Sequence, residues 1–257
     1  MLDKNAIIAL SNGMVDVEIF DIIDSTNAEA KRYANASAVC ENACPRLFIA
    51  REQTMGRGRM GREFLSRADS GIYMSLLYFT SKPLSDAVSV TTAAATIVAL
   101  AIERTTGREM KIKWVNDIYN DRGKVCGILA ETIPTADGGL GVVVGIGINT
   151  GDIDFPEELK KFASSVGDIG GMENELIAEI VNGLLAHADH PEDRSYMGEY
   201  RKRFMLMNEK VNLLQAGELV CSGRVMGVDD DGGLLFVPDG GDKTEIIRSG
   251  EISVRIR

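Results

Sequence analysis

Residues 124–148 read KVCGILAETIPTADGGLGVVVGIGI, two apolar runs separated by a turn. The runs Lys124–Ile133 and Gly141–Ile148 are rich in Val, Ile and Leu, and Ala136-Asp137-Gly138-Gly139 between them is typical of a tight connection. The pattern predicts a hairpin of two buried strands. Such a pair needs further strands beside it and helices to cover its faces.

The rest of the first 206 residues alternates between strand and helix patterns. Alternating apolar residues predict strands at Val15–Ile23, Leu47–Ala50, Gly71–Phe79 and Met110–Val115. Helical spacing predicts helices at Ala28–Tyr33, Leu84–Arg104, Asn174–Ala188 and Asp193–Leu206. Asp24-Ser25-Thr26-Asn27 is an N-cap cluster for the first helix, and Gly107 is placed to end the second. We therefore predict an α+β fold with a mixed sheet flanked by helices.

The last part of the chain has a different pattern. From Glu209 to Arg257 it reads as short strands divided by turns, with no helical period. We place a boundary near Met207, which divides the chain into residues 1–206 and residues 207–257. A module of about 50 residues buries a marginal core, so we expect it to pack against the larger domain.

The composition argues against several classes of protein. Lys and Arg total 28 against 38 Asp and Glu, and the net charge of -10 opposes nonspecific binding to a phosphate backbone. The four cysteines form no C-x-x-C pair and lie far from the two histidines, so we expect neither a zinc site nor a disulfide framework. The sequence shows no secretory leader and no membrane-spanning stretch. We expect a cytoplasmic protein.

The segment from Arg51 to Ser70 has no strand or helix period and contains Gly56-Arg57-Gly58-Arg59-Met60-Gly61-Arg62. Glycines let backbone N–H groups approach anionic oxygens, and guanidinium groups bind phosphate in bidentate geometry. The segment matches neither G-x-x-x-x-G-K-[ST] nor the dinucleotide G-x-G-x-x-G. A phosphate-bearing ligand is one interpretation. The alternatives are a flexible basic surface loop and an RNA-contacting segment.

A second group of charges surrounds the end of a predicted strand. Lys113-Trp114-Val115-Asn116-Asp117 is followed by Lys124 at the start of the next strand. Two cations, an amide and a carboxylate suit a polyphosphate with Mg²⁺. Alternatively, Lys113 and Asp117 form a surface ion pair, and for Trp114 we favour a place in the core.

Two further segments each have two interpretations. Gly145-Ile146-Gly147-Ile148-Asn149 indicates a backbone that closely approaches a ligand, or equally a strand that packs tightly on a helix. Ser25-Thr26-Asn27 offers hydroxyl and amide groups to a neutral ligand head group, or simply caps a helix. It is their combination with the charged segments that favours a ligand site.

Taken in order, these segments resemble the biotin protein ligase family. The resemblance spans residues 17–257 and rests on Asp24–Asn27, Gln53–Arg62, Lys113–Asp117, Lys124–Glu131, Gly145–Asn149 and Gly250–Val254. It implies a catalytic domain similar to class II aminoacyl-tRNA synthetases and shared by biotin and lipoate ligases. It also implies a small C-terminal SH3-like β-barrel.

The resemblance implies a reaction in two steps. Biotin attacks the α-phosphate of ATP in the presence of Mg²⁺ to give biotinyl-5'-AMP, and a lysine of a biotin carboxyl carrier domain then displaces AMP. Lys124, Arg57 and Arg59 would be the catalytic residues. Biotin would be bound by Ser25, Thr26, Asn27, Gln53, Arg57, Gly58, Arg59 and Lys124. The nucleotide would be bound by Arg59, Lys113, Asn116 and Asn149, and its Mg²⁺ by Asp117.

The chain departs from the family pattern in places. Phe64 stands where the family commonly has Trp, and Val115 replaces the proline of K-W-P-N-D. Too few residues precede the first strand for a winged helix-turn-helix, so we expect no DNA binding. We also expect no membrane association, and we hold a homodimer or carrier docking at an edge strand as hypotheses.

Two other functions are compatible with parts of this pattern. A lipoate or octanoate ligase or transferase would share the fold and Lys124, but the arginine segment and the C-terminal module favour biotin. A nonenzymatic RNA-binding module would use the arginine segment with the β-barrel. The acidic total and the absence of aromatic residues among the arginines argue against it.

Overall fold

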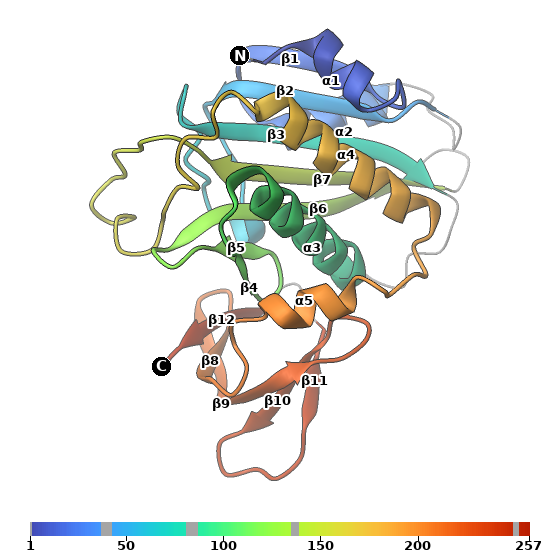
Figure 1. Cartoon of the computed structure of the whole chain (residues 1–257). Helices are drawn as coiled ribbons and strands as arrows, with labels where there is room; N and C mark the ends of the chain where they lie inside the picture. The colour runs from blue at the N-terminus through green and yellow to red at the C-terminus, as the bar shows by residue number, and fades with distance from the viewer. Residues whose placement is uncertain (1, 37–42, 81–86, 135–138, 249–251) are drawn as a thin grey trace.

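The computed structural model describes residues 2–36, 43–80, 87–134, 139–248 and 252–257 (Figure 1). Its main feature is a seven-stranded sheet in the order β1-β2-β3-β7-β6-β5-β4. The strands are β1 (Asp16–Ile23), β2 (Arg46–Gln53), β3 (Gly71–Thr80), β4 (Lys111–Lys113), β5 (Asp117–Tyr119), β6 (Lys124–Pro134) and β7 (Leu140–Asn149). β1 and β2 are parallel, and the other neighbours are antiparallel. The predicted mixed sheet, with β6 and β7 adjacent near its centre, is confirmed.

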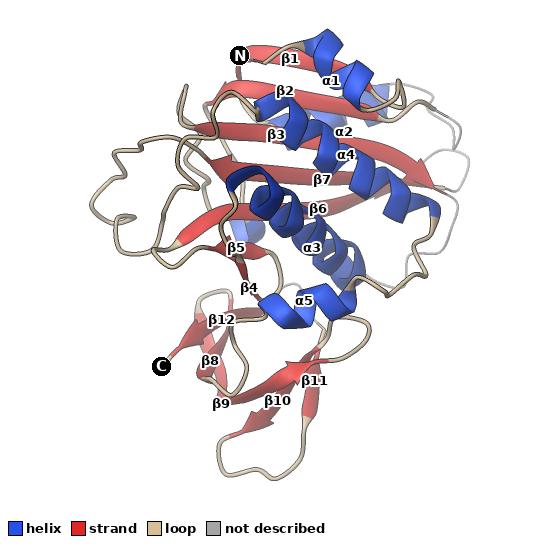
Figure 2. Ribbon diagram, in the orientation of Figure 1, coloured by secondary structure: helices blue, strands red, loops and turns tan. Residues whose placement is uncertain are grey.

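Helices cover both faces of this sheet (Figure 2). They are α1 (Lys4–Leu10), α2 (Thr26–Ala36), α3 (Ala87–Thr106), α4 (Glu173–Asp189) and α5 (Met197–Arg203). α1, α3 and α4 lie together on one face, whereas α2 packs on β2, β3 and β7 from the other, which we call the α2 face. α3 is long and apolar enough to span a membrane, but 72% of that stretch is buried inside the fold, as in a core helix.

Successive side chains of the central strands point to opposite faces of the sheet, and this alternation explains why the sheet has a core on each face. Phe48, Leu77 and Val143 point to the α2 face and form a small core with Ala30 of α2. Their neighbours in the chain point the other way, into the larger core that α1, α3 and α4 share. Strands covered on both sides must be apolar at successive positions, which accounts for the unbroken apolar runs in the sequence.

A second sheet follows, with five antiparallel strands in the order β11-β10-β9-β8-β12. They are β8 (Lys210–Gln215), β9 (Glu218–Val228), β10 (Leu234–Pro238), β11 (Glu245–Ile247) and β12 (Ile252–Ile256). Its buried side chains, among them Phe236, belong to the same continuous core as the first sheet. Trp114 Nε1 donates a hydrogen bond to the Gly232 carbonyl at 2.9 Å, which also joins the two parts. The C-terminal module therefore packs against the larger domain, as expected.

The structure also corrects several predictions. The helix predicted at Asp193–Leu206 is only Met197–Arg203, because the chain then turns to pair Phe204 with Ile112. The prediction contained neither α1 nor β5, and Arg51–Ser70 is less irregular than expected. α3 is observed from Ala87, and residues 84–86 lie outside the described residues, as do 136–138 of the predicted turn and Gly250-Glu251.

The small core under α2 gives a test of this packing. Phe48 is fully buried, so Phe48→Ala should lower the free energy of unfolding by about 3–5 kcal/mol through lost burial and a cavity. Phe162→Ala is the matched control: its ring is 65% exposed, and we expect a change within about 0.5 kcal/mol. Urea unfolding followed by circular dichroism measures both. Equal effects of the two substitutions would contradict the assignment of this core.

Candidate active site

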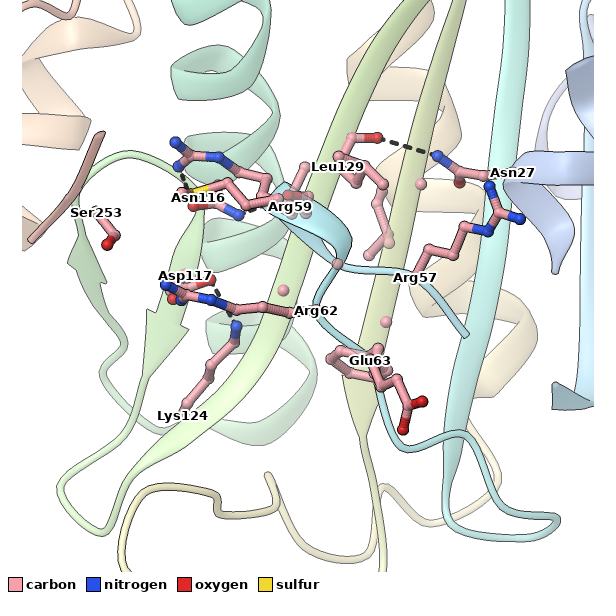
Figure 3. A pocket seen from close by; sticks show the side chains of 18 of the residues that line it. Asn27, Arg57, Arg59, Arg62, Glu63, Asn116, Asp117, Lys124, Leu129 and Ser253 are labelled. Carbon is pink, nitrogen blue, oxygen red and sulfur yellow. Dashed lines mark hydrogen bonds and ion pairs between the residues drawn. The ribbon is translucent and has the colours of Figure 1, made fainter. Parts of the chain in front are cut away.

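A pocket opens on the α2 face beside the start of α2 (Figure 3). It is lined by eleven of the twelve predicted site residues, namely Ser25, Thr26, Asn27, Gln53, Arg57, Gly58, Arg59, Lys113, Asn116, Asp117 and Lys124. Asn149 is not among the lining residues; its side-chain amide donates to the Ser164 carbonyl at 2.9 Å. Its assignment to the nucleotide stays a prediction.

The floor of the pocket consists of glycines in the two central strands. Gly127 on β6 pairs with Gly147 on β7, and Gly145 lies two residues before Gly147 on the same face. A Cβ at Gly145 would lie 1.9 Å from Asn27 Oδ1, and one at Gly147 would lie 2.5 Å from the Phe64 ring. Any side chain here would therefore displace residues that line the pocket.

The end of the pocket near α2 is neutral and rich in hydrogen-bonding groups. The Thr26 backbone N–H donates to Gln53 Oε1 at 2.8 Å, and Gln53 Nε2 donates to Ser66 Oγ at 2.8 Å. Asn27 contacts Ser75 of β3 and Glu131 of β6. Ser25, Thr26 and Asn27 are buried at the start of α2, and Ser25 is its N-cap. The capping interpretation is therefore confirmed, and the contact of these residues with a ligand stays a prediction that their place in the pocket lining is compatible with.

The arginine segment folds as a short hairpin above this floor. Arg57 and Glu63 form an antiparallel bridge, and the Gly58 N–H donates to the Arg62 carbonyl at 2.7 Å. Gly61, at the tip, has a φ of +71°, a conformation that favours glycine. The turn therefore holds the side chains of this segment in a defined position over the pocket.

The opposite end of the pocket is cationic. Arg59 donates to Asn116 Oδ1 at 2.8 Å and to the Ile252 carbonyl of β12 at 3.2 Å. Burial lowers the pKa of Arg59 below its ordinary value. Burial likewise lowers the pKa of Lys113; the carboxylate of Asp117 opposes this shift, and Lys124 adds to it. Positive charge is thus concentrated in a region of restricted solvent access, which suits an anionic ligand.

Asp117 pairs with Lys124 rather than with Lys113. Lys124 Nζ lies 2.7 Å from Asp117 Oδ1, with both side chains largely shielded from solvent (Figure 3). The surface ion pair considered for Lys113 and Asp117 is therefore replaced by a pair inside the pocket. Trp114 is 4% exposed, which confirms its predicted place in the core, and it also lines the pocket.

The donor set is compatible with Mg²⁺ only if a ligand supplies most of the oxygens. No group of three His, Cys, Asp or Glu side chains within the described residues could hold a metal ion. Mg²⁺ is commonly held by one or two carboxylates together with substrate phosphates, and Asp117 supplies one carboxylate. The residues present therefore fit a metal that arrives with a polyphosphate.

Several site residues were not predicted from the sequence. Ser66 and Ser75 are single serines outside the motifs quoted above, and only the fold brings them to the pocket or its network. Ser253 belongs to the Gly250–Val254 segment that carries part of the resemblance, yet it was not assigned to the site, because it lies 129 residues or more from Lys113 and Lys124 in the chain and only the fold brings it to the pocket. Phe64 was singled out as a departure, and its ring lies over the glycine floor.

Comparison with known proteins agrees with this geometry. The family model of the biotin/lipoate A/B protein ligases matches residues 19–149, and that of the biotin protein ligase C terminal domain matches residues 206–255. The bifunctional ligase/repressor BirA of Bacillus spizizenii is 35% identical over 232 residues, which cover 87% of this chain and 70% of BirA. The biotin--[acetyl-CoA-carboxylase] ligase of Mycobacterium tuberculosis is 26% identical, over 97% of this chain and 92% of its own.

Solved structures give the same result. A biotin protein ligase from Aquifex aeolicus, in complex with biotin and ATP, superposes with a TM-score of 0.75 at 26% identity, covering 94% of this chain and 99% of its own. The chain belongs to the biotin/lipoate A/B protein ligase family. Within that family, its second sheet is a biotin protein ligase C-terminal domain.

An ion pair at the start of α2 gives a pH-dependent test. Hydrogen bonds from Arg32, at 2.8 Å to each oxygen, lower the pKa of Asp24 from 3.8 to about 2. Because the pKa is lower in the folded state, the stabilisation is present above about pH 4 and is lost as the pH falls toward 2. Asp24→Asn should therefore lower the free energy of unfolding at pH 6 by no more than about 1 kcal/mol, since the pair is partly exposed.

Urea unfolding at pH 6, 4 and 2 checks this expectation. The difference between Asp24→Asn and the unsubstituted protein should be largest at pH 6 and should fall steeply between pH 4 and pH 2. Asp154→Asn is the control, since its carboxylate is 93% exposed, and it should change the free energy of unfolding by less than about 0.5 kcal/mol at each pH. A difference of the same size at pH 6 and pH 2 would mean that Asp24 acts through packing rather than charge.

Proposed function

We propose that the chain is an ATP-dependent biotin protein ligase. It joins biotin to a lysine of a biotin carboxyl carrier domain through a biotinyl-5'-AMP intermediate. The observation that carries this proposal is one continuous pocket with two chemically different ends. The neutral end, around Thr26 and Gln53, suits a ureido head group, and the cationic end, around Arg59 and Lys124, suits a carboxylate beside a phosphate chain.

In the first step, a carboxylate oxygen of biotin forms a bond to the α-phosphorus of ATP, and the bond to pyrophosphate breaks. Negative charge increases on the α-phosphate oxygens as this occurs. Lys124 and Arg59 are the cations at this end of the pocket, and Arg57 comes from the hairpin above it. Fixed positive charge lowers the energy of such a transition state more than water does, because it needs no reorganisation.

Lys124 is already oriented before any ligand arrives. One of its ammonium hydrogens is directed to Asp117, and the other two are available to the ligand. When bound with ATP, Mg²⁺ would supply further positive charge to the phosphates, and Asp117 is the residue that would hold it. Asp117 would then serve both as the partner of Lys124 and as a metal ligand.

In the second step, the amine of the acceptor lysine attacks the acyl carbon, and AMP leaves with the electrons of the acyl–phosphate bond. The mixed anhydride must be kept from water until then. The arginine hairpin, residues 57–63, and Phe64 lie over the pocket and are the segments placed to shield it. Residues 1–206 would supply the catalysis, while residues 207–257 close the cationic end through Ile252.

The partner and the location follow from the same proposal. A biotin carboxyl carrier domain is the acceptor, and the enzyme acts in the cytoplasm, where the free thiols of the described residues, those of Cys44, Cys126 and Cys221, stay reduced. Burial raises the pKa of the Cys126 thiol, so this cysteine takes no part as a nucleophile. A lipoate or octanoate ligase remains the rival function, and the C-terminal domain favours biotin over it.

The first test is biotin-dependent exchange of pyrophosphate into ATP. Lys124→Ala and Arg57→Ala should each lower the exchange rate by about 100-fold or more, because Lys124 is a cation of the reacting end and Arg57 belongs to the hairpin that covers the pocket. Lys160→Ala is the control, since Lys160 pairs with Glu157 on the surface. Exchange with lipoate alone would assign the chain to the lipoate branch, and RNA binding without any exchange would favour the nonenzymatic alternative.

A second test uses the glycine floor. Gly145→Ala should raise the KM for biotin by about 10-fold or more, because its Cβ would displace Asn27. Gly141→Ala, on the same face of β7, is the matched control: its Cβ would lie 3.3 Å from Phe79 and far from the pocket. Steady-state kinetics at saturating ATP measures both. Similar KM values for the two variants would show that Asn27 does not contact biotin.

A further inference from the structure

Glu131 contacts the neutral end of the pocket although it has no role in the reaction described above. Its Oε2 accepts a hydrogen bond from Asn27 Nδ2 at 3.0 Å, and its Oε1 lies 2.5 Å from Lys31 Nζ. Glu131 belongs to β6, whereas Asn27 and Lys31 belong to α2. The contact therefore ties the ligand-facing amide of the helix to a carboxylate on the sheet.

The oxygen of the Asn27 amide has a separate partner. Ser75 Oγ, fully buried on β3, lies 2.6 Å from Asn27 Oδ1. A carbonyl oxygen carries no hydrogen, so Ser75 is the donor. Rotating the amide by 180° would direct its oxygen at the Glu131 carboxylate and at the Leu129 carbonyl, two acceptors. Only one orientation of the Asn27 amide satisfies these neighbours.

This orientation decides what Asn27 offers to a ligand. One of its amide hydrogens is directed to Glu131. The other is directed more weakly, at 3.5 Å, to the Leu129 carbonyl (Figure 3). Oδ1 accepts from Ser75 and keeps a second lone pair. Asn27 therefore presents an acceptor to the pocket, and the negative charge of Glu131 strengthens it by polarising the amide.

Gln53 presents the complementary group. Its Oε1 accepts from the Thr26 N–H, and one Nε2 hydrogen is donated to Ser66 Oγ, which leaves one N–H for a ligand. The neutral end thus offers an acceptor on Asn27 and a donor on Gln53. A ureido group, with its N–H donors and carbonyl acceptor, matches this pair.

We propose that Glu131, together with Ser75, is a positioning residue that fixes Asn27 as the acceptor for a ureido N–H and so selects a ureido head group over a dithiolane or an alkyl chain. The proposal rests on the proposed function. A dithiolane or alkyl group has neither an N–H nor a carbonyl, so it would leave the second lone pair of the Asn27 oxygen and the remaining Gln53 N–H without a partner in a buried site. Sites built for a substrate N–H reject analogues that lack it for this reason.

Binding of biotin and of desthiobiotin to Glu131→Ala, Glu131→Gln and the unsubstituted protein tests the proposal. Desthiobiotin keeps the ureido group and lacks the sulfur ring. Glu131→Ala should raise the Kd of both ligands by the same factor, about 10-fold or more, because the Asn27 amide is then no longer fixed. The KM for ATP should change by less than about twofold. Glu131→Gln keeps an acceptor oxygen and should recover part of the affinity.

Glu179→Ala is the matched control, since Glu179 is ion-paired with Arg104 on the other face of the sheet. It should leave both Kd values unchanged. The proposal is overturned if Glu131→Ala leaves the biotin Kd unchanged, if biotin and desthiobiotin respond by different factors, or if the KM for ATP rises equally. If the unsubstituted protein shows no biotin-dependent pyrophosphate exchange, the proposed function fails as well. If the unsubstituted protein exchanges normally and Glu131→Ala leaves the biotin Kd unchanged, only the inference about Glu131 is refuted.

Discussion

The close approach of α2 to the central hairpin is the constraint on which the site depends. Asn27 occupies the volume that a side chain at Gly145 would take, and Phe64 occupies the corresponding volume above Gly147. Large residues fill the same face a few positions away, where Phe48, Leu77 and Val143 pack under α2. Along one face of β7, the change from Val143 to Gly145 and Gly147 therefore marks where this core gives way to the pocket, without any change in the backbone topology.

The second sheet completes the pocket. Arg59 reaches from the hairpin to the Ile252 carbonyl, and Trp114 reaches from the end of β4 to the Gly232 carbonyl. Both bonds connect site residues to the C-terminal module, and its apolar side chains share the core of the larger domain. A module of this size gains stability from that shared core, and the position of the Arg59 guanidinium in turn depends on the module.

Elements with long patterns and site residues that stand together in the chain could be predicted from the sequence. Short elements and site residues that are far apart in the chain could not. β6, β7 and α3 were recognised because their apolar patterns are long, whereas three-residue β5 and seven-residue α1 are too short to show a period. α5 was predicted too long because the apolar pattern continues beyond Arg203, where pairing of Phe204 with Ile112 ends the helix. Tertiary pairing of this kind overrides a local period.

The same reasoning applies to the site. Ser25–Asn27 and Arg57–Arg62 are recognisable because several functional groups stand together in the chain. Ser75 is a single serine in a strand, and its role follows from its register opposite Gly145 and its distance to Asn27, which only the fold determines. Asn149 stands at the end of a recognisable motif, and in the fold its amide donates to the Ser164 carbonyl, so its predicted contact with the nucleotide stays a prediction.

The charge distribution connects the pocket to the rest of the molecule. The whole chain carries a net charge of -10, whereas the reacting end of the pocket gathers Arg59, Lys113 and Lys124 around one carboxylate, Asp117. Burial lowers the pKa of Lys113 and of Arg59, so their charged forms are less stable there than in water. An anion that enters the pocket stabilises those charged forms, and binding and protonation therefore favour each other. A net negative charge on the whole chain opposes the approach of extended polyanions such as nucleic acid, whereas the buried cationic pocket suits a small phosphate ester that can enter.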